Sequence, residues 1–218
     1  MPNRTIEDQL REEYFLLLPA MARAAEQLKT QIQYTLLPIA RHLKKHENLI
    51  VKSRIKECSS AMDALRRRKD NNEGRLFDVD HPEIYSLLSL RDLVGVRVLA
   101  FPSSRTVEID ALLRAQFPDW TSDPIIDAGQ QLAFKYYGRC AEASEHVLCE
   151  YQIVPMLTGL FWEVEHSAIY KPAPNFKGIA SSLLMRDRRS EVYRALAGFE
   201  EEFERQIQIA ESIEIPRT

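Results

Sequence analysis

The sequence predicts an α+β fold, with helices flanking a mixed β-sheet. Two observations lead to this prediction. Segments rich in β-branched apolar residues occur among helical segments, but without the regular strand–helix–strand alternation of a parallel sheet. The chain has 218 residues, 45% of them hydrophobic and 28% charged, which is enough for one self-sufficient core.

The two ends of the chain are expected to be helical. Residues 1–48 predict two N-terminal helices, one from Thr5 to Leu17 and one from Pro19 onward, because proline suits a first helical turn. Pro38 should kink or split the second helix. Residues 173–218 predict a connector followed by an acid-rich helix over 182–212.

The middle segment, residues 49–172, is expected to hold the sheet. Leu93 to Phe101 is almost wholly apolar and β-branched, which predicts a buried central strand. Three further strands are expected over 49–56, 131–137 and 146–154, and helices over 59–69, 105–116 and 155–170. The apolar stripe expected to face the core on the last helix is Leu157, Leu160, Phe161, Val164 and Ala168.

Composition excludes several classes of protein. No apolar run reaches the ~18 residues of a membrane span, and the polar, acid-containing N-terminus does not resemble a targeting peptide. Cys58, Cys140 and Cys149 lack CxxC spacing, which argues against zinc and disulfides. We therefore expect a cytoplasmic protein without a membrane partner.

Positive charge is concentrated in one internal segment. The net charge is −3, yet residues 41–75 hold 11 Lys/Arg against 5 Asp/Glu, while residues 191–218 hold 3 against 7. Such a segment is typical of a polyanion site or of a solvated helix face.

The strand over 49–56 supplies cations for phosphate binding. The chain has 7 glycines and no glycine-rich phosphate motif, so side chains would have to bind phosphates. Lys52, Arg54 and Lys56 alternate and therefore share one face of the strand. Ile50, Val51 and Ile55 are expected to enter the core. A protected edge strand would show the same cations.

Acidic and amide side chains come from two other strands. Glu150 and Gln152 share one face, Asp92 precedes the apolar strand and Arg97 lies within it. A buried arginine needs a carboxylate or a ligand phosphate as partner. Asp92 and Glu150 together suit Mg²⁺ held between carboxylates and substrate phosphates, and one of them suits a general base on a ribose hydroxyl.

These residues resemble the synthetase domain of the RelA/SpoT family, particularly its small alarmone synthetases, over about residues 49–172. Four blocks in the family's order show the resemblance: SRIKECSS, LRDLVGVRVLAF, CEYQI and FWEVEHSAIYKP. The resemblance implies the family's nucleotidyltransferase-like fold. It also implies Mg²⁺-dependent transfer of pyrophosphate from ATP to the 3′-hydroxyl of GDP or GTP.

The resemblance also implies residue roles. Asp92 and Glu150 would be catalytic and hold the metal. Gln152 and Glu165 would lie on the acceptor side. The residues implied in ATP and phosphate binding are Lys52, Arg54, Lys56, Ser60, Arg97, His166 and Lys171.

Two departures from the family pattern bear on the acceptor and on catalysis. Ala64 stands where the family usually has a lysine, and the basic run over 66–69 follows it. The acceptor loop reads AGQQLAFKYYG, with Gln130, Leu132 and Phe134 at the expected Tyr, Ser and His positions. Phe134, Tyr136 and Tyr137 offer either another aromatic surface or ordinary sheet residues.

Three hypotheses follow. The chain is a pyrophosphokinase whose acceptor is a guanosine nucleotide or another molecule such as tRNA. Alternatively, it is a catalytically weak relative that binds a nucleotide or a partner. Independently, the C-terminal helix either forms a homo-oligomer or packs on its own domain.

Overall fold

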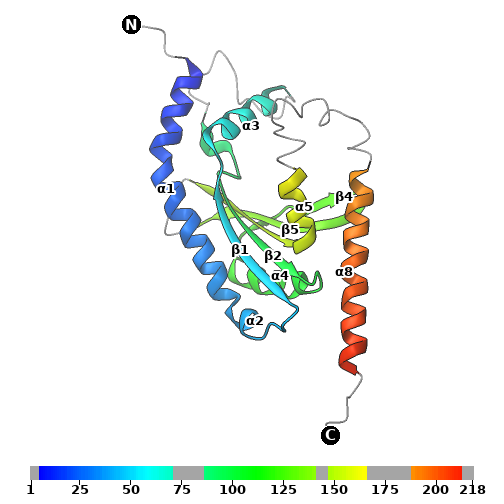
Figure 1. Cartoon of the computed structure of the whole chain (residues 1–218). Coiled ribbons are helices and arrows are strands. Elements are labelled where there is room, and N and C mark those ends of the chain that lie inside the picture. The colour runs from blue at the N-terminus through cyan, green and yellow to red at the C-terminus, as the bar shows by residue number, and fades with distance from the viewer. Residues whose placement is uncertain (1–4, 71–85, 141–146, 166–187, 213–218) are drawn as a thin grey trace.

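The structure is a computed structural model that describes residues 5–70, 86–140, 147–165 and 188–212, with only the backbone described for 66–70. It shows a mixed sheet flanked by helices, which confirms the predicted fold class (Figure 1). The helices are α1 (Ile6–Thr35), α2 (Leu37–Arg41), α3 (Cys58–Asp70), the short 3₁₀ helix η2 (Leu87–Ser89), α4 (Arg105–Gln116), α5 (Met156–Glu165) and α8 (Arg189–Ser212). The strands are β1 (Asn48–Ile55), β2 (Val94–Phe101), β3 (Thr121–Ser122), β4 (Ile125–Asp127), β5 (Gln130–Arg139) and β6 (Leu148–Pro155).

The sheet has the strand order β1-β2-β6-β5-β3, and β4 also pairs with β5. β2 and β6 are parallel, while β1 pairs antiparallel with β2 and β5 pairs antiparallel with β6. The apolar strand β2 thus lies between β1 and β6, as its sequence predicts.

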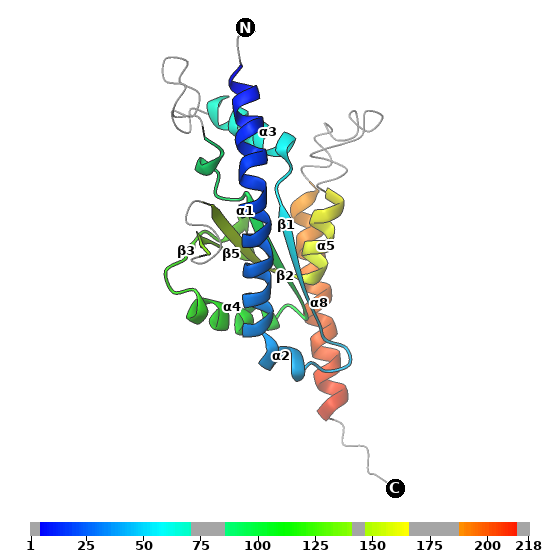
Figure 2. The same ribbon diagram turned by 90° about the vertical axis from the view of Figure 1, so that its left-hand side faces the viewer.

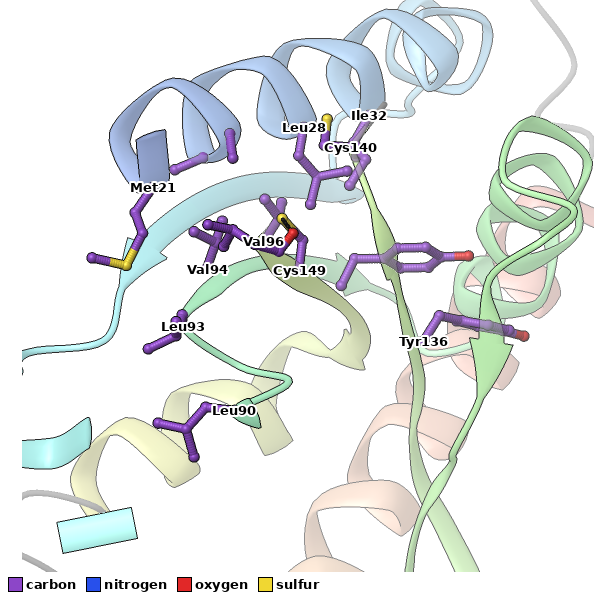
Figure 3. Packing of buried hydrophobic residues seen from close by; sticks show 14 of the residues in the cluster. Met21, Leu28, Ile32, Leu90, Leu93, Val94, Val96, Tyr136, Cys140 and Cys149 are labelled. Atoms are coloured by element: carbon purple, nitrogen blue, oxygen red, sulfur yellow. Dashed lines mark hydrogen bonds between the residues drawn. The ribbon is translucent and has the colours of Figure 1, made fainter. Parts of the chain in front are cut away.

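Helices cover the two faces of the sheet differently. α1 and α4 lie on one face, and α5 and α8 lie on the other (Figures 1 and 2). Under α1 the sheet contributes alternate residues such as Val94, Val96 and Tyr151 to the main core. Figure 3 shows Met21, Leu28 and other α1 side chains above these strands.

The N-terminal helix differs from its prediction at Pro19. α1 is one helix of 30 residues with Pro19 inside it, although a proline removes one backbone hydrogen bond. Both sides of the proline are anchored. Tyr14 is buried and donates its hydroxyl to the Lys56 carbonyl at 3.0 Å, and Met21 is fully buried. Tertiary packing therefore holds the helix together through the proline. Pro38 does end the run, in the first turn of α2.

The predicted apolar stripe of α5 is wrong at two of its positions, while Leu157 and Phe161 are half-buried and Ala168 lies outside the described residues. Leu160 and Val164 are 42% and 62% exposed, whereas Gly159 and Glu165 are buried. Gly159 lies against Leu99 of β2, where a Cβ would come within 2.3 Å of that side chain. The close approach turns the glycine, not the leucines, toward the sheet.

α8 packs on its own domain through Tyr193, Glu200 and Phe203. The Phe203 ring lies 5.3 Å from that of Phe101 on β2. This contact favours the packing alternative, and a homo-oligomer stays a prediction. No helix within the described ranges has the length and apolarity required to cross a bilayer.

Candidate active site

A cavity of about 640 Å³ lies on the sheet face under α5 and α8. Its floor comes from β1, β2 and β6, one wall from α5 and the start of α8, and another from the β4–β5 hairpin. The charged and amide side chains that line it are Lys52, Arg54, Arg97, Asp127, Glu150, Gln152, Glu163, Glu165 and Arg189.

The sheet register sets the floor in two rows. Lys52 pairs with Arg97 and Arg97 with Gln152; Arg54 pairs with Gly95 and Gly95 with Glu150. Because side chains alternate along a strand, both rows face the cavity. The predicted shared faces of Lys52 with Arg54 and of Glu150 with Gln152 are thus present. Ile50 has the same parity as the cations and packs beside Leu99, so it enters the core as expected, but from the face that carries Lys52 and Arg54.

Gly95 lets charges meet across β2. Arg54 on β1 reaches over the glycine and donates from Nη2 to Oε1 of Glu150 on β6 at 3.1 Å. A Cβ at Gly95 would lie 3.1 Å from Arg54 Nε and 3.5 Å from Glu150 Cγ. Burial raises the pKa of Glu150, Arg54 opposes this rise, and the nearby negative charge of Asp92 adds to it.

Arg97 differs from the other floor cations in its partner. Its Nε donates to Oε1 of Gln152 at 3.1 Å, and its guanidinium lies 5.6 Å from the Trp162 ring centroid. Among the described residues no carboxylate forms an ion pair with it, so the alternative of a structural Arg97–Glu pair is not met. Burial, and then repulsion from Arg54, lowers the pKa of Arg97. A half-buried guanidinium that is bonded to a neutral amide and open to a cavity is suited to binding an anion.

Asp92 and Lys56 form an ion pair beyond the end of β1, and neither residue lines the cavity. The predicted shared face of Lys56 with Lys52 and Arg54 is therefore wrong, because β1 ends at Ile55. The charge of Asp92 acts on Glu150, so the two carboxylates stand within electrostatic reach of each other. No cluster of three or more metal-ligating side chains occurs among the residues that the structure describes. Mg²⁺ in such sites is usually bound by one or two protein carboxylates together with phosphate oxygens of the substrate. Asp92 and Glu150 are the residues that would hold it.

The other predicted site residues lie in different parts of the structure. Lys52 is paired with Glu163 of α5 at 3.1 Å, both half exposed. Glu165 is buried and accepts a hydrogen bond from the Tyr193 hydroxyl at 2.9 Å. Ser60 is half-buried in the first turn of α3 and does not line the cavity. His166 and Lys171 lie outside the described residues.

The two departures from the family pattern also have structural counterparts. Ala64 packs against the main core from α3, and the side chains of the basic run after it lie outside the described residues. In place of the expected acceptor loop stands a tight hairpin whose turn residues, Ala128 and Gly129, have φ of 47° and 82°. Two positive φ values at a two-residue turn suit the twist of a hairpin.

The aromatic residues of β5 divide between the two faces. Phe134 and Tyr136 pack in the main core, where Tyr136 stacks on Tyr151 with ring centroids 4.9 Å apart. These two are ordinary sheet residues, which is one of the two predicted alternatives. Tyr137 has the other parity and pairs in register with Glu150.

Several cavity residues were not predicted from the sequence. They are Ile125, Ile126, Asp127, Leu132, Trp162, Glu163, Arg189 and Tyr193. Arg189 and Tyr193 belong to the start of α8, where an arginine-rich stretch precedes the acid-rich helix. That break in charge was the one available signal.

Comparison with solved structures identifies the fold. The small alarmone synthetase 1 from Bacillus subtilis matches with a TM-score of 0.63 and 20% identity, over 90% of this chain and 98% of that chain. The same protein bound to its product pppGpp matches with a TM-score of 0.62 and 18% identity, over 90% and 99%. A GTP pyrophosphokinase family protein from Streptococcus pneumoniae matches with a TM-score of 0.60 and 19% identity, over 94% and 98%.

No protein-family model matches the chain, and no curated protein matches it. The structural matches show that this chain has the fold of the small alarmone synthetases, which confirms the fold that the motif blocks imply.

Proposed function

We propose that the chain is a Mg²⁺-dependent pyrophosphokinase that uses ATP as donor and the 3′-hydroxyl of a nucleotide as acceptor, with GDP or GTP the expected acceptor. The observation that supports this most strongly is Arg97, a half-buried cation in the cavity floor whose described hydrogen-bond partner is a neutral amide. In the neighbouring row of the floor lies Glu150, a carboxylate whose pKa is raised by burial. The small alarmone synthetase 1 from Bacillus subtilis, which has the same fold, has been solved both bound to its product pppGpp and bound to AMPCPP.

In this proposal the 3′-hydroxyl oxygen attacks the β-phosphorus of ATP, the bond from that phosphorus to the α-phosphate oxygen breaks, and AMP leaves. Glu150 takes the hydroxyl proton. Mg²⁺ would neutralise phosphate charge between Asp92 and Glu150.

The cations hold the donor. Arg54 and Arg97 lie on adjacent strands of the floor, so a polyphosphate placed over Gly95 meets both guanidinium groups. Arg54 would exchange part of its contact with Glu150 for phosphate, which frees that carboxylate to act. Lys52 and Lys56 would add charge at the two ends of the β1 row.

The test is an acceptor panel. The purified protein is incubated with Mg²⁺ and γ-labelled ATP, together with GDP, GTP, ATP or tRNA in separate reactions. We expect label transfer to GDP or GTP, and its loss in Arg97→Met. Transfer to none of the four, with a working control enzyme, would reject the proposal. Transfer to tRNA alone would reassign the acceptor.

A second candidate is a nucleotide-binding protein without turnover. It is favoured by one observation: both carboxylates that the reaction needs are occupied by cations, Asp92 by Lys56 and Glu150 by Arg54. Calorimetry with AMPCPP discriminates the two. Binding without transfer in the panel supports the second candidate, and robust transfer eliminates it.

A further inference from the structure

The cavity has a second, less charged half at the β4–β5 hairpin. Ile125, Ile126 and Leu132 line it from the hairpin, and Trp162 and Tyr193 line it from α5 and α8. Ile126 is 61% exposed and lines the cavity, so its side chain is available to an apolar ligand surface there. This half suits the flat face of a nucleobase, whereas the floor cations at β1 and β2 suit phosphates.

The hairpin is weakly held by the sheet itself. β4 has three residues, its register shifts between Ile125 and Ile126, and within the described residues it pairs with β5. A bulged edge strand this short contributes little pairing of its own. Its position therefore depends on other contacts.

Those contacts come from the first turn of α8. Arg189 donates from Nη2 to Oδ1 of Asp127 at 3.2 Å, and Ser190 donates its hydroxyl to Oδ2 at 2.6 Å. The Ser190 hydrogen bond, followed by Arg189, lowers the pKa of Asp127 against the effect of burial. The carboxylate at the end of β4 is thus held as an anion by two residues of α8.

The same arginine reaches the opposite wall. Arg189 Nη1 lies 3.5 Å from Oε1 of the buried Glu165, at the end of α5. Tyr193, one turn along α8, donates to Oε2 of Glu165 at 2.9 Å and accepts from Trp162 Nε1 at 2.8 Å. Arg189 therefore ties the hairpin wall to the α5 wall across the cavity.

We propose that Arg189 and Asp127 are positioning residues for the acceptor: their ion pair holds the β4–β5 hairpin as the wall against which the acceptor nucleobase packs. This rests on the proposed function. It assigns the positioning of the acceptor to the contacts between α8 and the hairpin. An aromatic residue of the hairpin is not required, because Gln130, Leu132 and Phe134 offer no stacking ring to the cavity.

The test separates the two substrates by their KM values. In Arg189→Ala, the KM for the acceptor should rise about tenfold, since a hydrogen bond to a charged group contributes ~1.5–3 kcal/mol. The KM for ATP should stay within about twofold, because the donor cations lie on β1 and β2. Arg188→Ala is the matched control, since Arg188 is exposed and paired with Glu191 within α8. It should leave both KM values unchanged.

A double-mutant cycle tests whether the two residues act as one unit. If the ion pair is the positioning device, Asp127→Ala should raise the acceptor KM similarly, and the double variant should be no worse than either single one. Asp127→Asn keeps the shape and should show a smaller rise. It serves as the second variant if Arg189→Ala fails to fold, as judged by circular dichroism.

The outcomes are distinct. Absence of transfer by the wild-type chain would defeat the proposed function and this inference together. Transfer by the wild type, with equal rises of both KM values or with no rise in Arg189→Ala, would overturn the inference alone. Additive effects of Asp127→Ala and Arg189→Ala would also overturn it.

Discussion

The two faces of the sheet differ in the residues that they present: one is apolar and buried, and the other is charged and lines the cavity. Under α1 and α4, alternate residues of β2 and β6 are apolar and fully buried, and Tyr151 packs among Tyr136, Trp120 and Phe117. Under α5 and α8, the intervening residues of the same strands include Arg97, Glu150 and Gln152. One strand therefore contributes to the core with half of its residues and to the cavity with the other half.

The residues that stabilise the fold and the residues suited to chemistry thus lie on opposite faces of the sheet. Truncation of a side chain on the apolar face lowers the free energy of unfolding, because a cavity remains. On the polar face, desolvation of the charges offsets much of their mutual attraction, so these residues contribute little net stability. Substitutions on the first face should therefore change stability, and those on the second should change function.

The largest effect is expected at Tyr151. Tyr151→Ala should lower the free energy of unfolding by ~3–5 kcal/mol, since it empties a fully buried site whose ring touches three other rings. Urea denaturation measures this. Tyr151→Phe is the control: the buried hydroxyl has no hydrogen-bond partner among the described residues, so its removal should be neutral or stabilising. An equal loss in both variants would contradict the assignment of stability to ring packing.

Arg97→Met, on the cavity face of β2, should lower activity without lowering stability. The variant should lose about a hundredfold in pyrophosphate transfer, since a charged phosphate contact contributes ~1.5–3 kcal/mol. Its stability should be unchanged or higher, because methionine removes a desolvated charge. Steady-state kinetics and urea denaturation of the same preparation measure both. A stability loss as large as that of Tyr151→Ala would show that Arg97 is a structural residue.

The comparison of faces also shows what the sequence predicts. Strict alternation in β1 and β6 placed Lys52, Arg54, Glu150 and Gln152 correctly, because side-chain direction in a strand depends on parity alone. The apolar stripe of α5 was wrong at Leu160 and Val164, because Gly159 makes the close approach to the sheet. The contribution of Arg189 was unpredictable, since it depends on how α8 packs beside a hairpin 62 residues earlier in the chain.

Gly95 tests the contact that crosses between strands on the cavity face. Gly95→Ala should lower transfer about tenfold, because the new methyl group crowds Arg54 Nε at 3.1 Å and separates it from Glu150. Gly198→Ala is the matched control. Nothing lies within 4 Å of a Cβ there, so transfer should persist while the helix gains up to ~1 kcal/mol. Unchanged transfer in Gly95→Ala would mean that the Arg54–Glu150 contact is dispensable.

The smallest effect concerns Glu200, a buried acid at the junction of α8 and the start of α5. The Leu157 amide donates to its Oε1 at 3.3 Å, and burial raises the pKa of its carboxyl. A raised pKa in the folded state means that the folded chain binds the proton more tightly than the unfolded chain. The associated stability is present at acid pH and is lost as pH rises from the ordinary glutamate value through the raised one.

Glu200→Gln keeps an acceptor for the Leu157 amide without a titrating charge. The variant should therefore be more stable than the wild type at neutral pH, by about 1 kcal/mol, and the difference should shrink toward pH ~4. Urea denaturation at several pH values measures this, with exposed Glu201→Gln as the control, expected to stay within ~0.5 kcal/mol throughout. A difference that stays constant with pH would mean that the Glu200 carboxyl has the same pKa in the folded and the unfolded chain, which would contradict the effect of burial.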